Sequence, residues 1–231
     1  MNDEPRSLFD ELNAYLAQCE VYDFITRDSG LQHEACETLT DLLTRLADLK
    51  RSAIANQDED LANTLLGFEC AAHFLRSSIR MWLFLKAEKP EEAWRELVNA
   101  QMAVADAVRA HKGFERLARY ADRLHVMEEM LFPPQVFTSL GMIVRARKCS
   151  VCDAEYGECS HVVGKPYMGQ LCHTIVTEIE KLDHLSIVSN PANKLTRITH
   201  FSAPGGRRNR MTWKVEPDPP SREEPETNAS E

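Results

Sequence analysis

The sequence lacks the features that mark membrane, secreted and broadly nucleic-acid-binding proteins. No apolar run approaches the ~20 residues that a membrane-spanning helix needs. The first residues, "MNDEPRSLFDELNAYL", lack the basic and then apolar pattern of a signal peptide. The net charge is −9, whereas surfaces that bind duplexes need clustered Lys and Arg to neutralise phosphates. We therefore expect a cytoplasmic protein with no membrane segment and no broad basic surface.

Catalytic signatures are missing as well. The chain has no glycine-rich phosphate loop, no nucleophile elbow and no paired carboxylates at a recognisable spacing. The H-E-x-x-H pattern of zinc proteases and the H-x-E…P-C-x-x-C pattern of nucleobase deaminases are absent too. These absences favour a binding or accessory protein over an enzyme.

What is present predicts a mainly α protein. The 231 residues are 43% hydrophobic and 27% charged, as in ordinary soluble domains. Residues 1–132 read as about five helices joined by short loops, and "RDSG" with Gly30 is expected to end the first. The segment 59–87 is apolar on nearly every face, which is typical of a central helix. We predict a five-helix antiparallel bundle.

The composition changes after Pro133 and Pro134. Residues 133–202 are enriched in Val, Ile, Thr and Phe in short runs, which favours strands and a small α+β lobe. Residues 203–231 are rich in Pro, Glu, Arg and Ser and have few apolar anchors, so we expect a disordered, flexible tail.

The strongest pattern is "CSVCDAEYGECSH", which spans 149–161. Zinc prefers four tetrahedral nitrogen and sulfur ligands, and a two-residue spacer lets both thiolates of a Cys-x-x-Cys turn face one ion. A Cys-x-His pair on an extended segment adds two ligands on one face. The sequence therefore predicts a structural zinc site formed by Cys149, Cys152, Cys159 and His161.

Two alternatives concern this site. Cys172 could replace His161, which would make the site all-cysteine. A catalytic zinc would need an open coordination position and a general base, and the nearby Glu155 and Glu158 sit in the ligand loop, where acidic residues are usually solvated. A structural zinc is favoured. The other three of the seven cysteines, in helical apolar contexts, are expected to be small buried hydrophobes: Cys19, Cys36 and Cys70.

The segment "CSVCDAEYGECSHVVGKPYMGQLC", followed by "DHLSIVSNPANKLTRI", resembles a zinc-knob segment of phage-derived and bacterial proteins of unassigned function, some related to prohead proteases. In that segment Cys-x-x-Cys, Cys-x-His and Gly-x-x-Tyr-x-Gly precede a strand ending in Ser-x-Val-x-x-Pro-Ala. The further matching positions are Gly164, Tyr167, Gly169, Ser186, Val188, Pro191 and Ala192. The resemblance covers about 50 residues. The His and Ser of a prohead-type serine protease have no match upstream, so the resemblance does not indicate protease activity.

These observations favour a zinc-binding helical adaptor or accessory subunit that docks to a larger protein or forms a homo-oligomer, in a phage-related or bacterial defence system. One alternative is a ribonuclease similar to HEPN domains, because Arg119 and His125 have the Arg-x5-His spacing of that class. Another is a nucleic-acid-binding accessory protein that uses the basic segment 205–214, "GGRRNRMTWK", with Trp213 for stacking.

Overall fold

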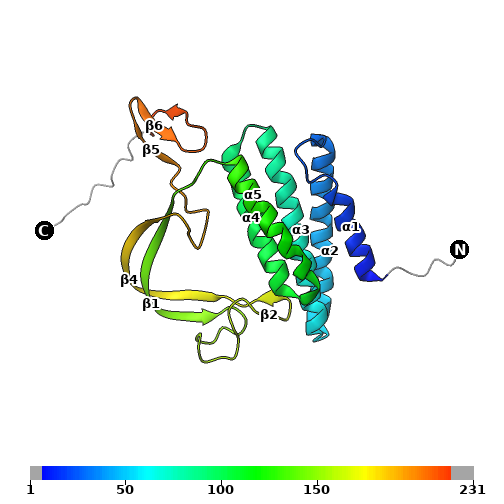
Figure 1. The fold of residues 1–231 in the computed structure, drawn as a ribbon. Coiled ribbons are helices and arrows are strands. Elements are labelled where there is room, and N and C mark those ends of the chain that lie inside the picture. The colour runs from blue at the N-terminus through cyan, green and yellow to red at the C-terminus, as the bar shows by residue number, and fades with distance from the viewer. Residues whose placement is uncertain (1–6, 220–231) are drawn as a thin grey trace, which may run out of the picture.

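The computed structural model describes residues 7–219, which form five α-helices followed by small antiparallel sheets (Figure 1). The helices are α1 (Leu8–Glu20), α2 (Ser29–Ala55), α3 (Glu59–Lys86), α4 (Pro90–Ala110) and α5 (Ala118–Leu131), with a 3-10 helix η1 (Lys112–Leu117) before α5. The mainly α fold with a β-containing lobe is as the sequence predicts. No helix in residues 7–219 combines the length and apolarity needed to cross a bilayer.

Helix α3 lies at the centre of the helical part. It packs against α1, α2 and α4, and its buried residues extend from Ala62 to Trp82 around most of its circumference. The apolar stripe of α2 faces it through Leu39, Leu42 and Leu46. Each large apolar side chain buried in this way contributes roughly 1.5–3 kcal/mol. The expectation that 59–87 is the central helix is therefore confirmed.

The first helix ends earlier than predicted. It stops at Glu20, and Gly30 lies in the first turn of α2, where Asp28 caps the helix by accepting from the Leu31 amide at 3.1 Å. The prediction that Gly30 ends the first helix is wrong. The physical reason lies in the connecting loop, where a buried carboxylate holds the chain in a turn.

That carboxylate belongs to Asp23, of which only 1% is exposed. Its Oδ1 accepts hydrogen bonds from Ser78 Oγ at 2.6 Å and from Trp82 Nε1 at 3.1 Å. Arg123 Nη2 lies 3.3 Å from Oδ2 and donates to the Asp23 carbonyl at 3.0 Å. Burial raises the pKa of Asp23, and these three partners oppose that rise. The loop is thus bonded to both α3 and α5.

The β-containing part is organised around one long two-stranded ribbon. Strand β1 (Phe137–Cys149) pairs antiparallel with β4 (Thr174–Val188), and the segment between them carries the short hairpin β2 (Pro166–Tyr167) and β3 (Gln170–Leu171). In Figure 1 the ribbon curves away from the helices in its middle and returns to them at the β2 end. Both ends of the ribbon are thereby tied to the bundle.

A third sheet occupies the stretch where a flexible tail was expected. It has three strands in the order β5 (His200–Ala203), β6 (Gly206–Asn209) and β7 (Val215–Glu216). The prediction of disorder from residue 203 is wrong as far as residue 219, and residues 220–231 lie outside the described part of the chain. The composition did not reveal this sheet because polar contacts with distant residues, together with the single buried Met211, hold it on the bundle.

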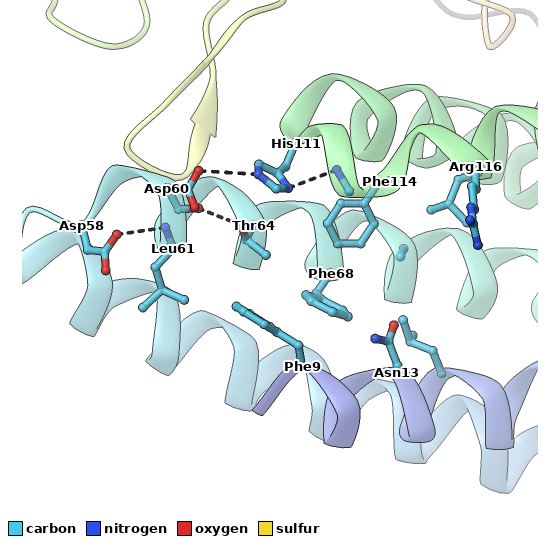
Figure 2. A pocket seen from close by; sticks show the side chains of 14 residues that line it. Phe9, Asn13, Asp58, Asp60, Leu61, Thr64, Phe68, His111, Phe114 and Arg116 are labelled. Carbon is cyan, nitrogen blue, oxygen red and sulfur yellow. Dashed lines mark hydrogen bonds and ion pairs between the residues drawn. The ribbon is translucent and has the colours of Figure 1, made fainter. Parts of the chain in front are cut away.

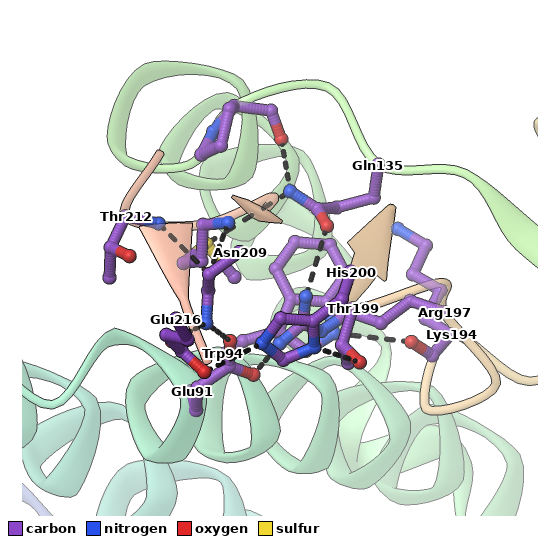
Figure 3. A network of polar contacts seen from close by, with 12 residues as sticks. Glu91, Trp94, Gln135, Lys194, Arg197, Thr199, His200, Asn209, Thr212 and Glu216 are labelled. Atoms are coloured by element: carbon purple, nitrogen blue, oxygen red, sulfur yellow. Dashed lines mark hydrogen bonds and ion pairs between the residues drawn. The ribbon is translucent and has the colours of Figure 1, made fainter. Parts of the chain in front are cut away.

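Figure 3 shows these contacts on the first turns of α4. Arg197, whose side chain is only 4% exposed, forms an ion pair with Glu91 and donates to Gln135 Oε1 at 3.2 Å. Asn209 donates to Glu91 at 3.4 Å and to Glu216 at 3.2 Å. Trp94 donates through Nε1 to the Lys194 carbonyl at 3.1 Å, again tying the segment to α4.

Candidate metal centre

The four predicted ligands converge at the end of the ribbon where Cys149 pairs with Thr174. The donor atoms of Cys149, Cys152, Cys159 and His161 all lie within 4.8 Å of one another. Cys149 is the last residue of β1, and the other three follow in the loop before β2. Soft donors at such distances are compatible with one bound metal ion.

The local backbone explains how the first two cysteines face the same point. The Asp153 amide donates to the Cys149 carbonyl at 3.0 Å, and Asp153 takes a positive φ of 58°, which closes a tight turn. Inside it the Val151 amide donates to Cys149 Sγ at 3.4 Å. Amide donation to sulfur stabilises the thiolate, which is the form that binds metal.

Burial raises the pKa of the Cys149 thiol, but hydrogen bonds from the amides of Val151 and Cys152 and from the thiols of Cys152 and Cys172 outweigh it and lower this pKa to about 6. At neutral pH this sulfur is therefore a thiolate. The pKa values of Cys152 and Cys172 are instead raised. For Cys152, a hydrogen bond from the Ala154 amide lowers the pKa, but burial and the neighbouring sulfurs raise it by more. For Cys172, burial is the main cause of the raised pKa. Crowded thiolates repel one another, and a divalent cation removes that repulsion.

His161 is held with one nitrogen toward the cluster. Its ring meets the Tyr167 ring edge to face, with centroids 4.6 Å apart, and the Tyr167 hydroxyl accepts from the Val162 amide at 3.0 Å. The Nδ1 atom of His161 is buried and has no hydrogen-bond partner within the described residues. A buried nitrogen without a partner is costly, and coordination to a metal would satisfy it.

Cys172 lies at the same cluster. Its Sγ is 3.8 Å from Cys149 Sγ, and both residues are buried. With zinc–sulfur bonds of ~2.3 Å, two sulfurs on one tetrahedral ion lie ~3.8 Å apart. The structure therefore brings together both residues that compete for the fourth position, His161 and Cys172.

We call residues 133–202, which include the four candidate ligands, the metal lobe. It contacts the bundle through the turn between β2 and β3. Met168 and Gly169 both have positive φ, 44° and 77°, as a tight two-residue hairpin requires. The Gly169 amide donates to Asn63 Oδ1 of α3 at 2.8 Å. A Cβ on Gly169 would lie 3.0 Å from the Lys50 side chain and 3.3 Å from the Ala62 carbonyl, so the turn lies close against α2 and α3.

The ribonuclease pair is placed differently. Arg119 and His125 both lie on α5 and are exposed; Arg119 packs over the Tyr120 ring at 5.2 Å, and His125 Nε2 lies 3.4 Å from Glu129. Neither residue lines the cavity of about 590 Å³ shown in Figure 2. That cavity has an aromatic lining of Phe9, Phe68 and Phe114 and a polar edge with Asp60 and His111.

The basic segment 205–214 belongs to the C-terminal sheet. Arg208 donates to the Trp213 carbonyl at 3.2 Å, Arg210 donates to the Pro134 carbonyl at 3.3 Å, and Arg207 lies 3.8 Å from Glu216. Trp213 stays 56% exposed and meets Phe201 edge to face. The arginines of this segment thus have protein partners.

The sequence pointed to only some of the residues that support the centre. Tyr156 and Tyr167 hold the ligand loop through the Val163 and Val162 amides, and Asn63 receives the lobe on α3. The Gly-x-x-Tyr-x-Gly pattern marked Tyr167 and Gly169, but nothing near Asn63 signals a contact across more than a hundred residues.

Comparisons with protein-family models, with curated proteins and with solved structures found no match to this chain.

Proposed function

We propose that this protein is a zinc-binding, non-enzymatic accessory protein whose antiparallel helical bundle and metal lobe together present a docking surface to a larger protein. The observation that carries the metal assignment is the convergence of four soft donors with a buried, unpartnered Nδ1 on His161. Three cysteines and one histidine form a donor set typical of closed structural zinc sites.

In this proposal the ligands are Cys149, Cys152, Cys159 and His161, and Cys172 is a thiol packed against them. Zinc supplies a rigid tetrahedral link between the end of β1 and the following loop. The ligands leave no open coordination position, and Tyr156 and Tyr167 are engaged in holding the loop. This arrangement favours a structural role over a catalytic one.

The docking role is supported by how the metal lobe is displayed. The lobe is fixed to α3 at Asn63 and to α4 through Glu91 and Trp94, while the ribbon between these attachments lies away from the helices (Figure 1). Rigid attachment at both ends keeps a long surface available at low entropic cost on binding. The resemblance of the Cys/His segment to phage-derived proteins supports a phage-related or bacterial defence setting.

Cobalt substitution combined with ligand variants tests the metal assignment. We expect one zinc per chain in freshly purified protein, and thiolate-to-cobalt charge-transfer absorption after exchange with Co²⁺. His161→Ala should change the d–d absorption and weaken metal binding by about 10- to 100-fold or more, whereas Cys172→Ser should leave both unchanged. The reverse result would assign the all-cysteine site, and the absence of stoichiometric metal would remove the zinc centre altogether.

The accessory role is tested against the ribonuclease alternative with the same purified protein. We expect no cleavage of single-stranded RNA. If RNA is degraded, and both Arg119→Ala and His125→Ala abolish the cleavage while the metal content stays constant, the protein is an enzyme and the accessory role is wrong. Unchanged cleavage in both variants would point to a contaminating nuclease, and loss in only one variant would show an activity of this chain that does not use the Arg-x5-His pair.

A further inference from the structure

The ribbon carries a continuous row of apolar side chains along one face. Directly opposed residues of two antiparallel strands lie on the same face. Leu140 is opposite Leu185, Met142 is opposite Leu182, and Val144 is opposite Ile179. Ile187, opposite Thr138, continues the row toward the bundle. We call these eight residues the apolar ladder: Thr138, Leu140, Met142, Val144, Ile179, Leu182, Leu185 and Ile187.

Two irregularities in β4 keep this ladder on one face. On β1 the ladder residues alternate strictly, but on β4 the spacing from Leu185 to Leu182 and from Leu182 to Ile179 is three residues. Each longer step contains one residue without a partner on β1, Asp183 and Glu180. A strand without these bulges would turn the ladder residues to opposite faces. The bulges thus preserve an apolar face.

The other face of the ribbon is polar. Ser139 is opposite Ser186, Gly141 is opposite His184, and Ile143 is opposite Lys181. The His184 ring lies directly over Gly141, because a Cβ added there would come within 2.4 Å of it. The ribbon is therefore amphipathic. In these three pairs, Ile143 is the one large apolar side chain on the polar face.

Within residues 7–219, six of the eight ladder residues stay exposed, whereas Thr138, which bonds to Thr196, and Val144 are half-buried. Leu140, Met142, Ile179, Leu182, Leu185 and Ile187 are 39–72% exposed. Six such side chains form a patch on the order of 500 Å², the size of the largest apolar patch on a typical monomer, and such patches are often functional. A two-stranded ribbon is marginally stable until its apolar face is covered. The terminal sequences "MNDEPR" and "PSREEPETNASE" contain one large apolar residue between them, Met1, and so cannot supply that cover.

We propose that the apolar ladder is a homodimer interface, in which the ladders of two copies of this chain pack face to face about a two-fold axis. The pairing turns two exposed ribbons into a two-layer β-sandwich with the layers ~10 Å apart. Because a two-fold interface brings the same patch from each subunit together, an apolar patch complements itself.

Charge and area favour a second copy as the occupant. None of the eight ladder positions is charged, so two chains of net charge −9 can meet there without burying like charges. Two patches of this size bury on the order of 1,000 Å², near the lower bound for a specific interface. The bulges at Asp183 and Glu180 also disrupt the β4 edge, which disfavours edge-to-edge pairing and leaves the face as the contact.

Sedimentation equilibrium of the full-length, metal-loaded protein tests this proposal. At up to about 100 µM, a concentration that populates a micromolar complex, we expect twice the chain mass of 26.3 kDa. The double variant Leu182→Ser/Leu185→Ser should weaken the dimer at least about 100-fold, because each lost leucine is removed twice in a two-fold interface. The matched control Ile143→Ser, on the polar face, should leave the dimer unchanged.

A second variant guards against misfolding. Met142→Glu places a charge on the same face from the other strand, and it should also give a monomer with unchanged metal content and circular dichroism. A monomeric wild-type protein at every concentration would overturn the proposal and leave the ladder to a different protein. Dissociation by Ile143→Ser to the same extent, or a persisting dimer in both ladder variants that fold, would overturn it as well.

Discussion

The helical bundle and the ribbon with its metal-binding tip are held together by different means. In α3 alone, buried residues extend through more than twenty positions from Ala62 to Trp82. In the ribbon and its tip, residues 137–188, the buried apolar side chains are Phe137, Cys149 and Cys172, and two of these three are at the metal cluster. The contrast shows that the bundle has extensive apolar burial, whereas the ribbon and its tip have little. This difference agrees with the proposed metal site and the proposed covering of the ribbon by a second copy.

Metal removal should give the largest difference in stability between the two regions. Structural zinc contributes apparent binding free energies of ~10–16 kcal/mol, more than a tip with so few buried side chains can replace. After chelation, we expect hydrogen exchange in residues 149–173 to become fast while α2 and α3 stay protected. Cys152→Ser should reproduce the effect, and Cys36→Ser, which alters a half-buried bundle thiol, should not. Equal loss of protection in both regions would contradict the comparison.

Asp23→Ala tests whether the bundle also depends on a polar contact. The substitution leaves Ser78 and Trp82 without their acceptor and removes the ion pair of Arg123, which keeps its bond to the carbonyl of residue 23. This loss should cost about 2–4 kcal/mol in the free energy of unfolding. Urea unfolding followed by circular dichroism measures this change. Asp28→Ala, which removes only a helix cap, should cost about 1 kcal/mol. Metal content should be unchanged in both variants, and its loss would show that the two regions are coupled.

The smallest expected effect is a pH dependence specific to the bundle. Burial lowers the pKa of His73 below its ordinary value of 6.5. The folded state therefore binds fewer protons here than the unfolded state, so stability is full above pH 6.5 and falls as the pH drops through this value. The free energy of unfolding of His73→Gln should fall less than that of the wild type between neutral and acidic pH. Parallel curves would show that His73 does not contribute.

Local patterns predicted what local interactions determine. The leucine spacing around Leu39 and Leu42 gave α2, and the two-residue spacer between Cys149 and Cys152 gave the first two donors of the cluster. The errors at Gly30 and after residue 203 share a cause. Asp23 and Glu91 each bind residues far away in the sequence, and no local pattern reports such partners.

The sequence predicted the donor residues of the candidate site but not the residues that surround and support them. The sequence left His161 and Cys172 as alternatives, and the structure places both at the cluster. The ribbon face could not be foreseen, because the irregular spacing of Leu185, Leu182 and Ile179 matches neither a strict strand period nor a helix. Only the paired strands show that the three share one side.

The contacts that tie the metal lobe and the C-terminal sheet to the helices also imply an order of assembly during synthesis. Trp94 and Lys194 are 100 residues apart, Asn63 and Gly169 are 106 apart, and Glu91 and Asn209 are 118 apart. Every helix is complete in the nascent chain before any of these later partners has been translated. Because domains form from the N-terminus as the chain emerges, the bundle becomes a preformed template on which the ribbon closes last.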